Sequence, residues 1–322
     1  MIEDLEYKCS VGALLYSPAT SRKLARGIVE EKYGRPYSVA MCLEDAIGEN
    51  MVKSAEENVK NTLREICRER EKRKFFMPKL FIRVREPEQM ERIFLENEDC
   101  RELITGFIFP KYSVGNGEEY NRILEKINQV SARKIYMMPI LESGDIISFE
   151  TRRETLTALR RLIDSMREYV LNVRVGGNDF CSQFGLRRRW DQTIYEVLPV
   201  AGVLTDILTE FSRDYIVSAP VWEYFDGEEW ERGLERELAG DRLNGFTGKT
   251  VIHPRQIQVV NRSFMVSEKD YEDALRILEW DTKDLLVAKS GDGKRMDEVK
   301  THYGWAVKTK ALAGVYGVSK EE

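Results

Sequence analysis

Two segments have the pattern from which the fold can be predicted: Tyr136-Met137-Met138-Pro139-Ile140-Leu141-Glu142-Ser143-Gly144 and Asn172-Val173-Arg174-Val175-Gly176-Gly177-Asn178-Asp179. Each is a short apolar run ending in a carboxylate at a glycine-containing turn, which is typical of a buried parallel strand whose C-terminal end carries chemistry. Glu142 and Asp179 are 37 residues apart, the length of a β-α-β unit, which places strand ends side by side. Two such carboxylates favour a hard divalent cation such as Mg²⁺. Alternatively, Glu142 caps the next helix and Asp179 lies in an ordinary polar turn.

Strand-like and helix-like segments alternate along the rest of the chain. The alternation predicts eight strand-helix steps and therefore an α/β fold, a (β/α)₈ TIM barrel over residues 1–284. An open doubly wound sheet would require a G-x-G-x-x-G turn, and the sequence has none. The predicted strands are 11–16, 37–43, 79–84, 105–109, the run before Glu142, 170–175, 215–218 and 249–252, and the predicted helices are 22–32, 50–74, 87–95, 118–130, 152–167, 193–208, 228–241, 256–264 and 268–282.

Composition narrows the class of protein. The 322 residues carry 50 Lys+Arg against 55 Asp+Glu, a net charge of -5, so nothing favours nucleic acid or a membrane as partner. The acidic N-terminus is unlike a signal peptide, and no apolar run approaches a membrane span. We therefore expect a cytoplasmic protein. Two histidines disfavour a multi-histidine zinc site, and five cysteines without C-x-x-C spacing indicate reduced thiols.

Reactive side chains fall at or just after the predicted strands. In a barrel these positions share the C-terminal face, which carries active sites. Arg83 lies inside the strand Phe81-Ile82-Arg83-Val84, and a buried arginine is costly unless it meets an anion. A substrate carboxylate or phosphate would serve, and so would Glu44 or Asp45. The residues at these strand ends are Glu44, Asp45, Arg83, Lys111, Glu142, Asp179 and His253.

Six fragments in order resemble the HpcH/HpaI aldolase and citrate lyase β-chain superfamily. More narrowly, the tail at 289–300 with Trp305-Ala306 resembles citrate-lyase-like C–C bond lyases encoded with tellurium-resistance and stress operons. The six fragments are Leu43-Glu44-Asp45-Ala46, Ile82-Arg83-Val84, Phe109-Pro110-Lys111, Leu141-Glu142-Ser143-Gly144, Gly176-Gly177-Asn178-Asp179 and the run 245–257, which contains His253-Pro254.

The resemblance implies a barrel that binds Mg²⁺, or Mn²⁺, through Glu142 and Asp179. It implies that Arg83 binds a substrate carboxylate. The substrate would be a 2-oxo or 3-hydroxy acid, or an acyl-CoA thioester, cleaved or joined at a carbon–carbon bond. Cleavage leaves an enolate whose charge the metal stabilises. A general base must take the hydroxyl proton, and the candidates are Glu44, Asp45 or a hydroxide on the metal. The other substrate-binding candidates are Lys111, Gly177, Asn178 and His253.

The chain also departs from the superfamily. Citrate lyase β-chains usually begin with Arg-Ser-x-Leu-Phe-x-Pro-Gly, whereas here that arginine is absent and Ala19 replaces the glycine, which puts CoA binding in question. Arg187-Arg188-Arg189-Trp190 forms part of an insert that either holds a phosphorylated substrate or begins a solvated basic helix. His253 either shapes the pocket or is structural.

Two other functions stay open. The chain is alternatively a non-catalytic metal-binding or assembly component of a stress-resistance operon, or a metal-dependent isomerase or phosphotransferase that acts on an enolate. Retention of Arg83, Glu142 and Asp179 disfavours the non-catalytic reading.

Residues 285–322 form a predicted C-terminal extension. It begins with a polar glycine-rich run at 289–294 and continues as an amphipathic helix, whose apolar face must be buried on its own barrel or on a neighbour. The resemblance implies a homo-oligomer, a trimer or hexamer, in which this part reaches over the adjacent subunit. We therefore expect the second arrangement, with Gly291-Asp292-Gly293 as its hinge.

Overall fold

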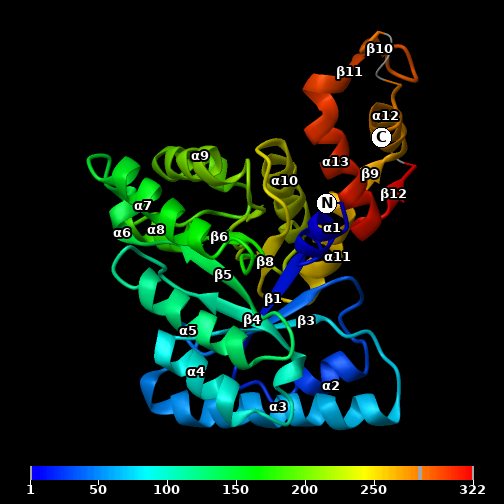
Figure 1. Ribbon diagram of the computed structural model, residues 1–322. Helices are drawn as coiled ribbons and strands as arrows, with labels where there is room; N and C mark the ends of the chain where they lie inside the picture. The colour runs from blue at the N-terminus through cyan, green and yellow to red at the C-terminus, as the bar shows by residue number, and fades with distance from the viewer. Residues whose placement is uncertain (1, 282–284, 321–322) are drawn as a thin grey trace.

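A computed structural model describes residues 2–281 and 285–320, and its central feature is an eight-stranded parallel sheet in the order β7-β6-β5-β4-β3-β2-β1-β8. The sheet closes where Ala219, just after β7, pairs with Lys249 of β8. The predicted (β/α)₈ barrel is therefore confirmed (Figure 1). The strands are β1 (Ala13–Pro18), β2 (Ser38–Cys42), β3 (Lys79–Arg83), β4 (Ile104–Phe109), β5 (Tyr136–Leu141), β6 (Val173–Val175), β7 (Val217–Ser218) and β8 (Lys249–Val251).

Helices between successive strands form the outer layer (Figure 1). In α3, which corresponds to the helix predicted at 50–74, Ala55, Val59, Leu63 and Ile66 are buried at helical spacing. The helices of this layer are α2 (Leu24–Val29), α3 (Val52–Lys72), α4 (Pro87–Glu96), α5 (Gly117–Val130), α7 (Arg152–Ser165), α9 (Leu198–Phe211), α10 (Trp230–Leu243) and α11 (Arg255–Phe264). Shorter helices outside the predicted ones are α1 (Ile2–Cys9), η2 (Arg101–Leu103), α6 (Gly144–Ile147) and α8 (Gly177–Gln183). Two further short helices overlap predicted ones: η1 (Glu49–Met51) at the start of 50–74 and η3 (Ile194–Glu196) within 193–208.

Two predicted helices differ from the structure by four residues or more at one end. The helix predicted at 193–208 is divided into η3 and α9, which meet around Val197. Pro199 lies in the first turn of α9, where its missing N–H suits a helix start and not a helix interior. The helix predicted at 268–282 is α12 (Glu268–Leu278), and position 282 lies outside the described residues.

A separate apolar cluster fills the barrel interior. It contains Leu14, Ala40, Phe81, Ile108 and Met138, which point inward from successive strands, and Tyr16 packs against it. This apolar cluster fills the interior, as expected for a barrel of eight strands. The strand ends beyond it are left for polar side chains, so the site forms at the C-terminal mouth.

The C-terminal part forms a lobe beside the barrel (Figure 1). Helix α13 (Val299–Tyr316) packs against α12 and α1 of its own chain, with Ala274, Ile277 and Ala306 as a small core. The Tyr316 hydroxyl donates to the carbonyl of Cys9 at 3.0 Å. The lobe also contains the pairs β9 (Val266–Ser267) with β12 (Val318–Ser319) and β10 (Val287–Lys289) with β11 (Met296–Glu298).

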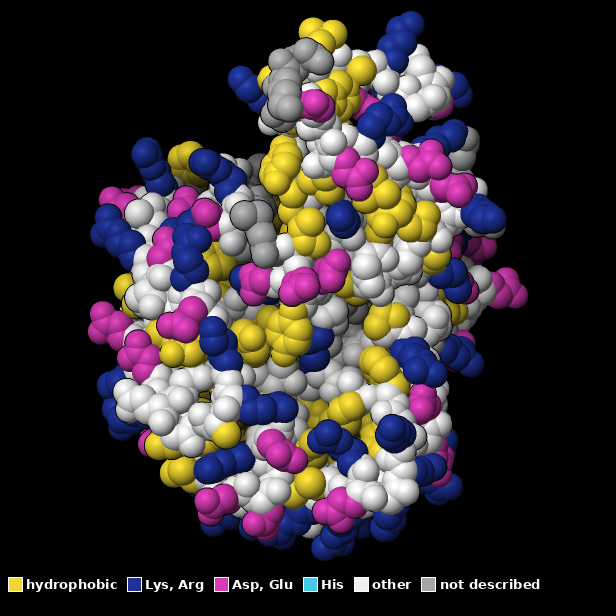
Figure 2. All heavy atoms as spheres, turned by 45° about the vertical axis from the view of Figure 1, so that its right-hand side comes forward, with side chains coloured by type: hydrophobic (Ala, Val, Ile, Leu, Met, Phe, Trp, Pro, Cys, Tyr) yellow, Lys and Arg dark blue, Asp and Glu magenta, His cyan; other side chains and the backbone are white. Residues whose placement is uncertain are grey.

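Hydrophobic side chains also lie on the surface of this lobe (Figure 2). Leu285 is 70% exposed, Met296 56% and Tyr303 48%, so its apolar surface is only partly covered by its own chain. The predicted domain boundary at residue 284 lies outside the described residues. None of the described helices is long and apolar enough to cross a membrane.

Candidate active site

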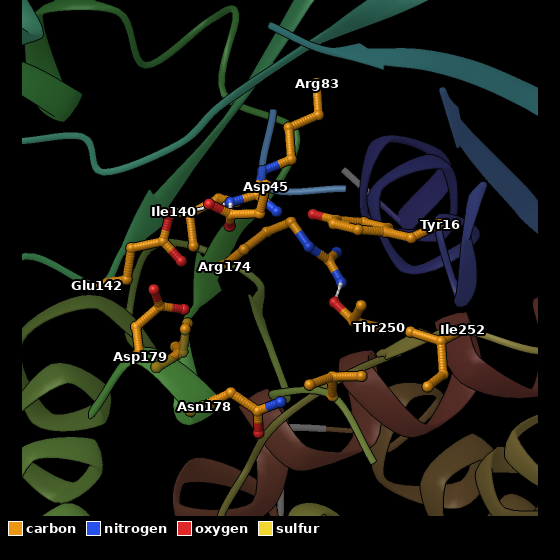
Figure 3. A pocket seen from close by; sticks show the side chains of 14 residues that line it. Tyr16, Asp45, Arg83, Ile140, Glu142, Arg174, Asn178, Asp179, Thr250 and Ile252 are labelled. Carbon is orange, nitrogen blue, oxygen red and sulfur yellow. Dashed lines mark hydrogen bonds and ion pairs between the residues drawn. The ribbon is translucent and has the colours of Figure 1, made fainter. Parts of the chain in front are cut away.

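The reactive residues predicted from the sequence converge on one mouth of the barrel. Glu44 and Asp45 follow β2, Arg83 ends β3, Lys111 follows β4, Glu142 follows β5 and Asp179 lies in the first turn of α8 after β6. Because parallel strands end at the same edge, their side chains are brought together although 135 residues separate Glu44 from Asp179. Figure 3 shows Asp45, Glu142 and Asp179 around one cavity.

Arg83 is buried at the centre of three carboxylates. Its Nη2 lies 2.7 Å from Glu44 Oε2, 2.9 Å from Asp45 Oδ2 and 3.4 Å from Glu142 Oε1. Burial alone lowers the pKa of Arg83, but the surrounding negative charge outweighs it and raises the pKa. Arg83 Nε has no hydrogen-bond partner. The predicted internal pairing with Glu44 and Asp45 is thus present, and an unused donor remains.

Lys111 supports the same carboxylates from β4. Its backbone N–H donates to Glu142 Oε1 at 2.8 Å, and its ammonium lies 2.5 Å from Glu44 Oε1 and 3.1 Å from Asp45 Oδ1. The residue has a φ of 48°, an uncommon left-handed conformation for a side chain of this size. This conformation directs both donors to neighbouring strand ends, so Lys111 positions carboxylates.

Glu142 and Asp179 form a compact acidic pair. A Cβ built on Gly176 would lie 2.3 Å from Glu142 Oε2 and 3.1 Å from Asp179 Oδ2, so both carboxylates lie against that α-carbon, and only glycine fits there. Burial and the nearby Asp179 charge raise the pKa of Glu142 to about 8. A bound cation would remove this repulsion.

The residues present therefore fit a hard divalent cation. Carboxylate oxygens are the ligands Mg²⁺ prefers, and it commonly takes one or two of them with water or substrate completing the shell. Within residues 2–281 and 285–320, no group of three or more His, Cys, Asp and Glu side chains is arranged to hold a metal. Glu142 and Asp179 would supply two carboxylates to such an ion.

The cavity beside this pair has a volume of ≈ 210 Å³. Six predicted site residues line it, and Glu44, Lys111 and His253 are not among the described lining residues. Glu44 and Lys111 instead contact residues that line the cavity: Glu44 pairs with Arg83, and Lys111 pairs with Asp45. The six are Asp45, Arg83, Glu142, Gly177, Asn178 and Asp179.

His253 is occupied by local contacts. Its ring stacks on Phe225 with centroids 4.6 Å apart, and its Nδ1 accepts the Arg255 N–H at 3.3 Å. Burial lowers its pKa. These contacts fix the turn from β8 to α11, so they support the structural alternative for His253.

The three arginines of the insert do not form a phosphate site together. Arg188 is buried and paired with Glu237, Arg187 lies 3.4 Å from Glu223, and Arg189 lies 2.9 Å from Asp191. The prediction of a shared anion site is wrong because each guanidinium has its own carboxylate. The alternative of a helix start is also wrong, since 187–190 lies between helices.

Among the lining residues that the sequence analysis did not identify, three have polar side chains: Tyr16 of β1, Arg174 of β6 and Thr250 of β8. Arg174 repeats the signal that identified Arg83, an arginine flanked by β-branched residues near the end of a strand. The same pattern predicts both, and only one of them was interpreted as functional.

Comparisons with known proteins agree with this architecture. The model of a family described as C–C bond lyases of the TIM-barrel fold matches residues 5–318. The solved structure of a citrate lyase from Burkholderia xenovorans is similar at a TM-score of 0.72, with 15% identity over 96% of this chain and 94% of that one. CitE from Mycobacterium tuberculosis, solved with magnesium, acetoacetate and coenzyme A, is similar at 0.60, with 16% identity over 94% of this chain and 98% of that one.

Curated relatives match shorter segments. A (3S)-malyl-CoA thioesterase from Cereibacter sphaeroides is 32% identical over 102 residues, which is 32% of this chain and 33% of that protein. A citrate lyase subunit beta from Haemophilus influenzae is 43% identical over 49 residues, 15% of this chain and 17% of that protein. The chain thus matches at most a third of the length of these relatives.

Proposed function

Since the chain belongs to the C–C bond lyase family of the TIM-barrel fold, we propose that it is a Mg²⁺-dependent carbon–carbon bond lyase. Its substrate is a carboxylate-bearing 2-oxo or 3-hydroxy acid, or the acyl thioester of one. The observation that carries this proposal is the juxtaposition of the Glu142–Asp179 pair with Arg83 around one cavity. The magnesium in the CitE structure and the malyl-CoA thioesterase relative support the cation and the substrate class.

Glu142 and Asp179 would hold the ion, which supplies Lewis-acid stabilisation of the negative charge that develops as the bond breaks. Arg83 then has two tasks. It holds Glu142 within 3.4 Å, and it is placed to bind a substrate carboxylate in the cavity through its remaining donors. Substrate binding and orientation of the acidic pair are therefore coupled through one guanidinium.

Asp45 is our choice for the general base. Unlike Glu44, it lines the cavity, and its side chain is 52% exposed. Burial raises its pKa, but contacts with Glu44, Arg83 and Lys111 outweigh burial and lower it. A substrate carboxylate that binds Arg83 offsets part of its positive charge, which weakens this stabilisation and strengthens Asp45 as a base. It then accepts the hydroxyl proton while the electron pair of the broken bond passes to the enolate.

The test is a product assay with both 2-oxo or 3-hydroxy acids and their CoA thioesters, in Mg²⁺ and in EDTA. With Mg²⁺ present, we expect the substrate to be cleaved into two products. With EDTA, or with Asp179→Asn, we expect no cleavage. Release of free CoA without carbon–carbon cleavage would instead assign thioester hydrolysis, and turnover that is unaffected by EDTA would contradict metal dependence.

We also propose that the chain belongs with the lyases of tellurium-resistance operons and acts as a homo-oligomer. The resemblance of the tail at 289–300 supports the first assignment. The exposed apolar side chains of Leu285, Met296 and Tyr303 support the second.

A further inference from the structure

Arg174 is a buried cation without an acidic partner. It is 1% exposed, and no ion pair to a carboxylate includes it among the described residues. Its Nη2 donates to Thr250 Oγ1 at 2.6 Å and its Nη1 to Asn172 Oδ1 at 3.3 Å, while Nε has no hydrogen-bond partner. A buried charge held only by neutral oxygens is expensive unless a ligand compensates it.

The contrast with Arg83 is direct. Both arginines line the same cavity, but Arg83 is neutralised by Glu44, Asp45 and Glu142. Figure 3 shows Arg174 directed away from the acidic residues, toward Thr250, with the Tyr16 hydroxyl turned toward it. The cavity therefore has an acidic side, where the cation would bind, and a side of uncompensated positive charge.

We propose that Arg174 binds a second anionic group of the substrate, which makes the substrate a diacid. Thr250 is the positioning residue that orients the guanidinium. This inference rests on the proposed function. One carboxylate of the diacid lies beside Arg83 and the Glu142–Asp179 pair, and the other forms charge-assisted hydrogen bonds with Arg174. The cavity volume of ≈ 210 Å³ suits a small acid of this kind.

The first arm of the test does not depend on metal or turnover. Malonate is titrated calorimetrically into the metal-free full-length chain, into Arg174→Met and into the exposed control Arg167→Met. We expect at least about tenfold weaker binding in Arg174→Met alone. Equal affinity in wild type and Arg174→Met, or no malonate binding by wild type, would overturn the proposal.

Stability separates a ligand-binding arginine from a structural one. Replacement of a buried unpaired charge by an apolar side chain of similar length is neutral or stabilising, so the Tm of Arg174→Met should equal or exceed that of wild type. Thr250→Val should weaken malonate binding, because the hydroxyl is the group that orients Arg174. Thr250→Ser keeps a hydroxyl and should bind malonate like wild type. A lower Tm of Arg174→Met together with unchanged malonate binding would show a purely structural role.

The second arm measures, by calorimetry in Mg²⁺, the affinity for diacids and for monoacids with the same number of carbons. The two pairs are 2-oxoglutarate with 2-oxopentanoate and oxaloacetate with 2-oxobutanoate. Wild type should prefer the diacid of at least one pair by about tenfold or more, and Arg174→Met should lose that preference. A preference that survives Arg174→Met, or none in wild type, would overturn the diacid assignment. Malonate binding that depends on Arg174, without binding of any oxo acid, would leave the anion site intact and contradict the proposed function.

Discussion

Arg83 Nη2 lies 3.4 Å from Glu142 Oε1, so the ends of β3 and β5 are connected by a guanidinium across the intervening β4. The same Glu142 oxygen accepts the Lys111 N–H at 2.8 Å. Both donors act on Oε1, while Oε2 is the oxygen that faces the α-carbon of Gly176 beside Asp179. Glu142 therefore has one oxygen fixed by the protein and one directed toward its acidic partner.

Arg83→Lys should retain charge and lose function. A lysine cannot bridge the carboxylates and present a two-pronged surface to a substrate. We expect kcat/KM to fall about 10- to 100-fold, the effect of losing a charge-assisted hydrogen bond of ~1.5–3 kcal/mol. Steady-state kinetics on the substrate found in the product assay measure it, and full activity would make Arg83 an internal ion-pair residue only.

Asp45→Asn should lower kcat with little change in KM, because the amide cannot accept the hydroxyl proton. Glu44→Gln serves as the comparison, since Glu44 also pairs with Arg83 and Lys111 but does not line the cavity. If Glu44→Gln is the variant with the larger loss of kcat, the base is assigned to the wrong carboxylate.

The barrel closes over a buried charge cluster away from the cavity. Lys249 of β8 lies 2.9 Å from Glu237 Oε1 and 2.8 Å from Asp241 Oδ2, all with side chains 0% exposed, and Arg188 pairs with Glu237 as well. Glu237→Gln should lower the free energy of unfolding by about 3–5 kcal/mol, since it leaves buried cations undercompensated. Denaturant titration measures this, and Glu229→Gln, which removes the exposed partner of Arg232, should change stability little.

Lys79 provides a pH dependence of stability. It is largely buried at the start of β3, and burial lowers its pKa to about 8 from an ordinary 10.5. Between these two values the unfolded chain holds more protons than the folded chain, so stability should rise as the pH increases from about 8 to about 10.5. Lys79→Met should lack this rise. An identical pH profile for both chains in urea titrations would show that burial does not govern Lys79.

The C-terminal extension is predicted to hold the assembly together. A chain truncated before Ser290 loses α13, and light scattering should show an assembly of fewer subunits than the wild-type assembly. Because α13 also packs on α1 and α12, the circular dichroism of the truncated chain must first show a folded barrel. A folded truncated chain that forms an assembly with the wild-type number of subunits would show that the extension does not hold the oligomer together.

The barrel was predictable because apolar runs, helical spacing and strand-end charges agree along the chain. The acidic residues were found because parallel strands end on one face, whatever their separation in sequence. Arg174 was missed because it lies inside a β-branched run that was interpreted only as a strand. The separate partners of Arg187, Arg188 and Arg189 depend on tertiary packing, which adjacency in sequence does not encode. The short α1 also gave no clear signal, because one residue of its eight, Cys9, is buried.

Calorimetric titration of Mg²⁺ measures whether Glu142 and Asp179 bind a metal ion. Wild type should bind one ion, and Asp179→Asn should bind it at least about tenfold more weakly, because Asp179 supplies one of two protein carboxylates. Asp145→Asn, a change at an exposed residue three positions after Glu142, should bind like wild type. Equal binding by wild type and Asp179→Asn would contradict the assignment of Glu142 and Asp179 as the metal pair.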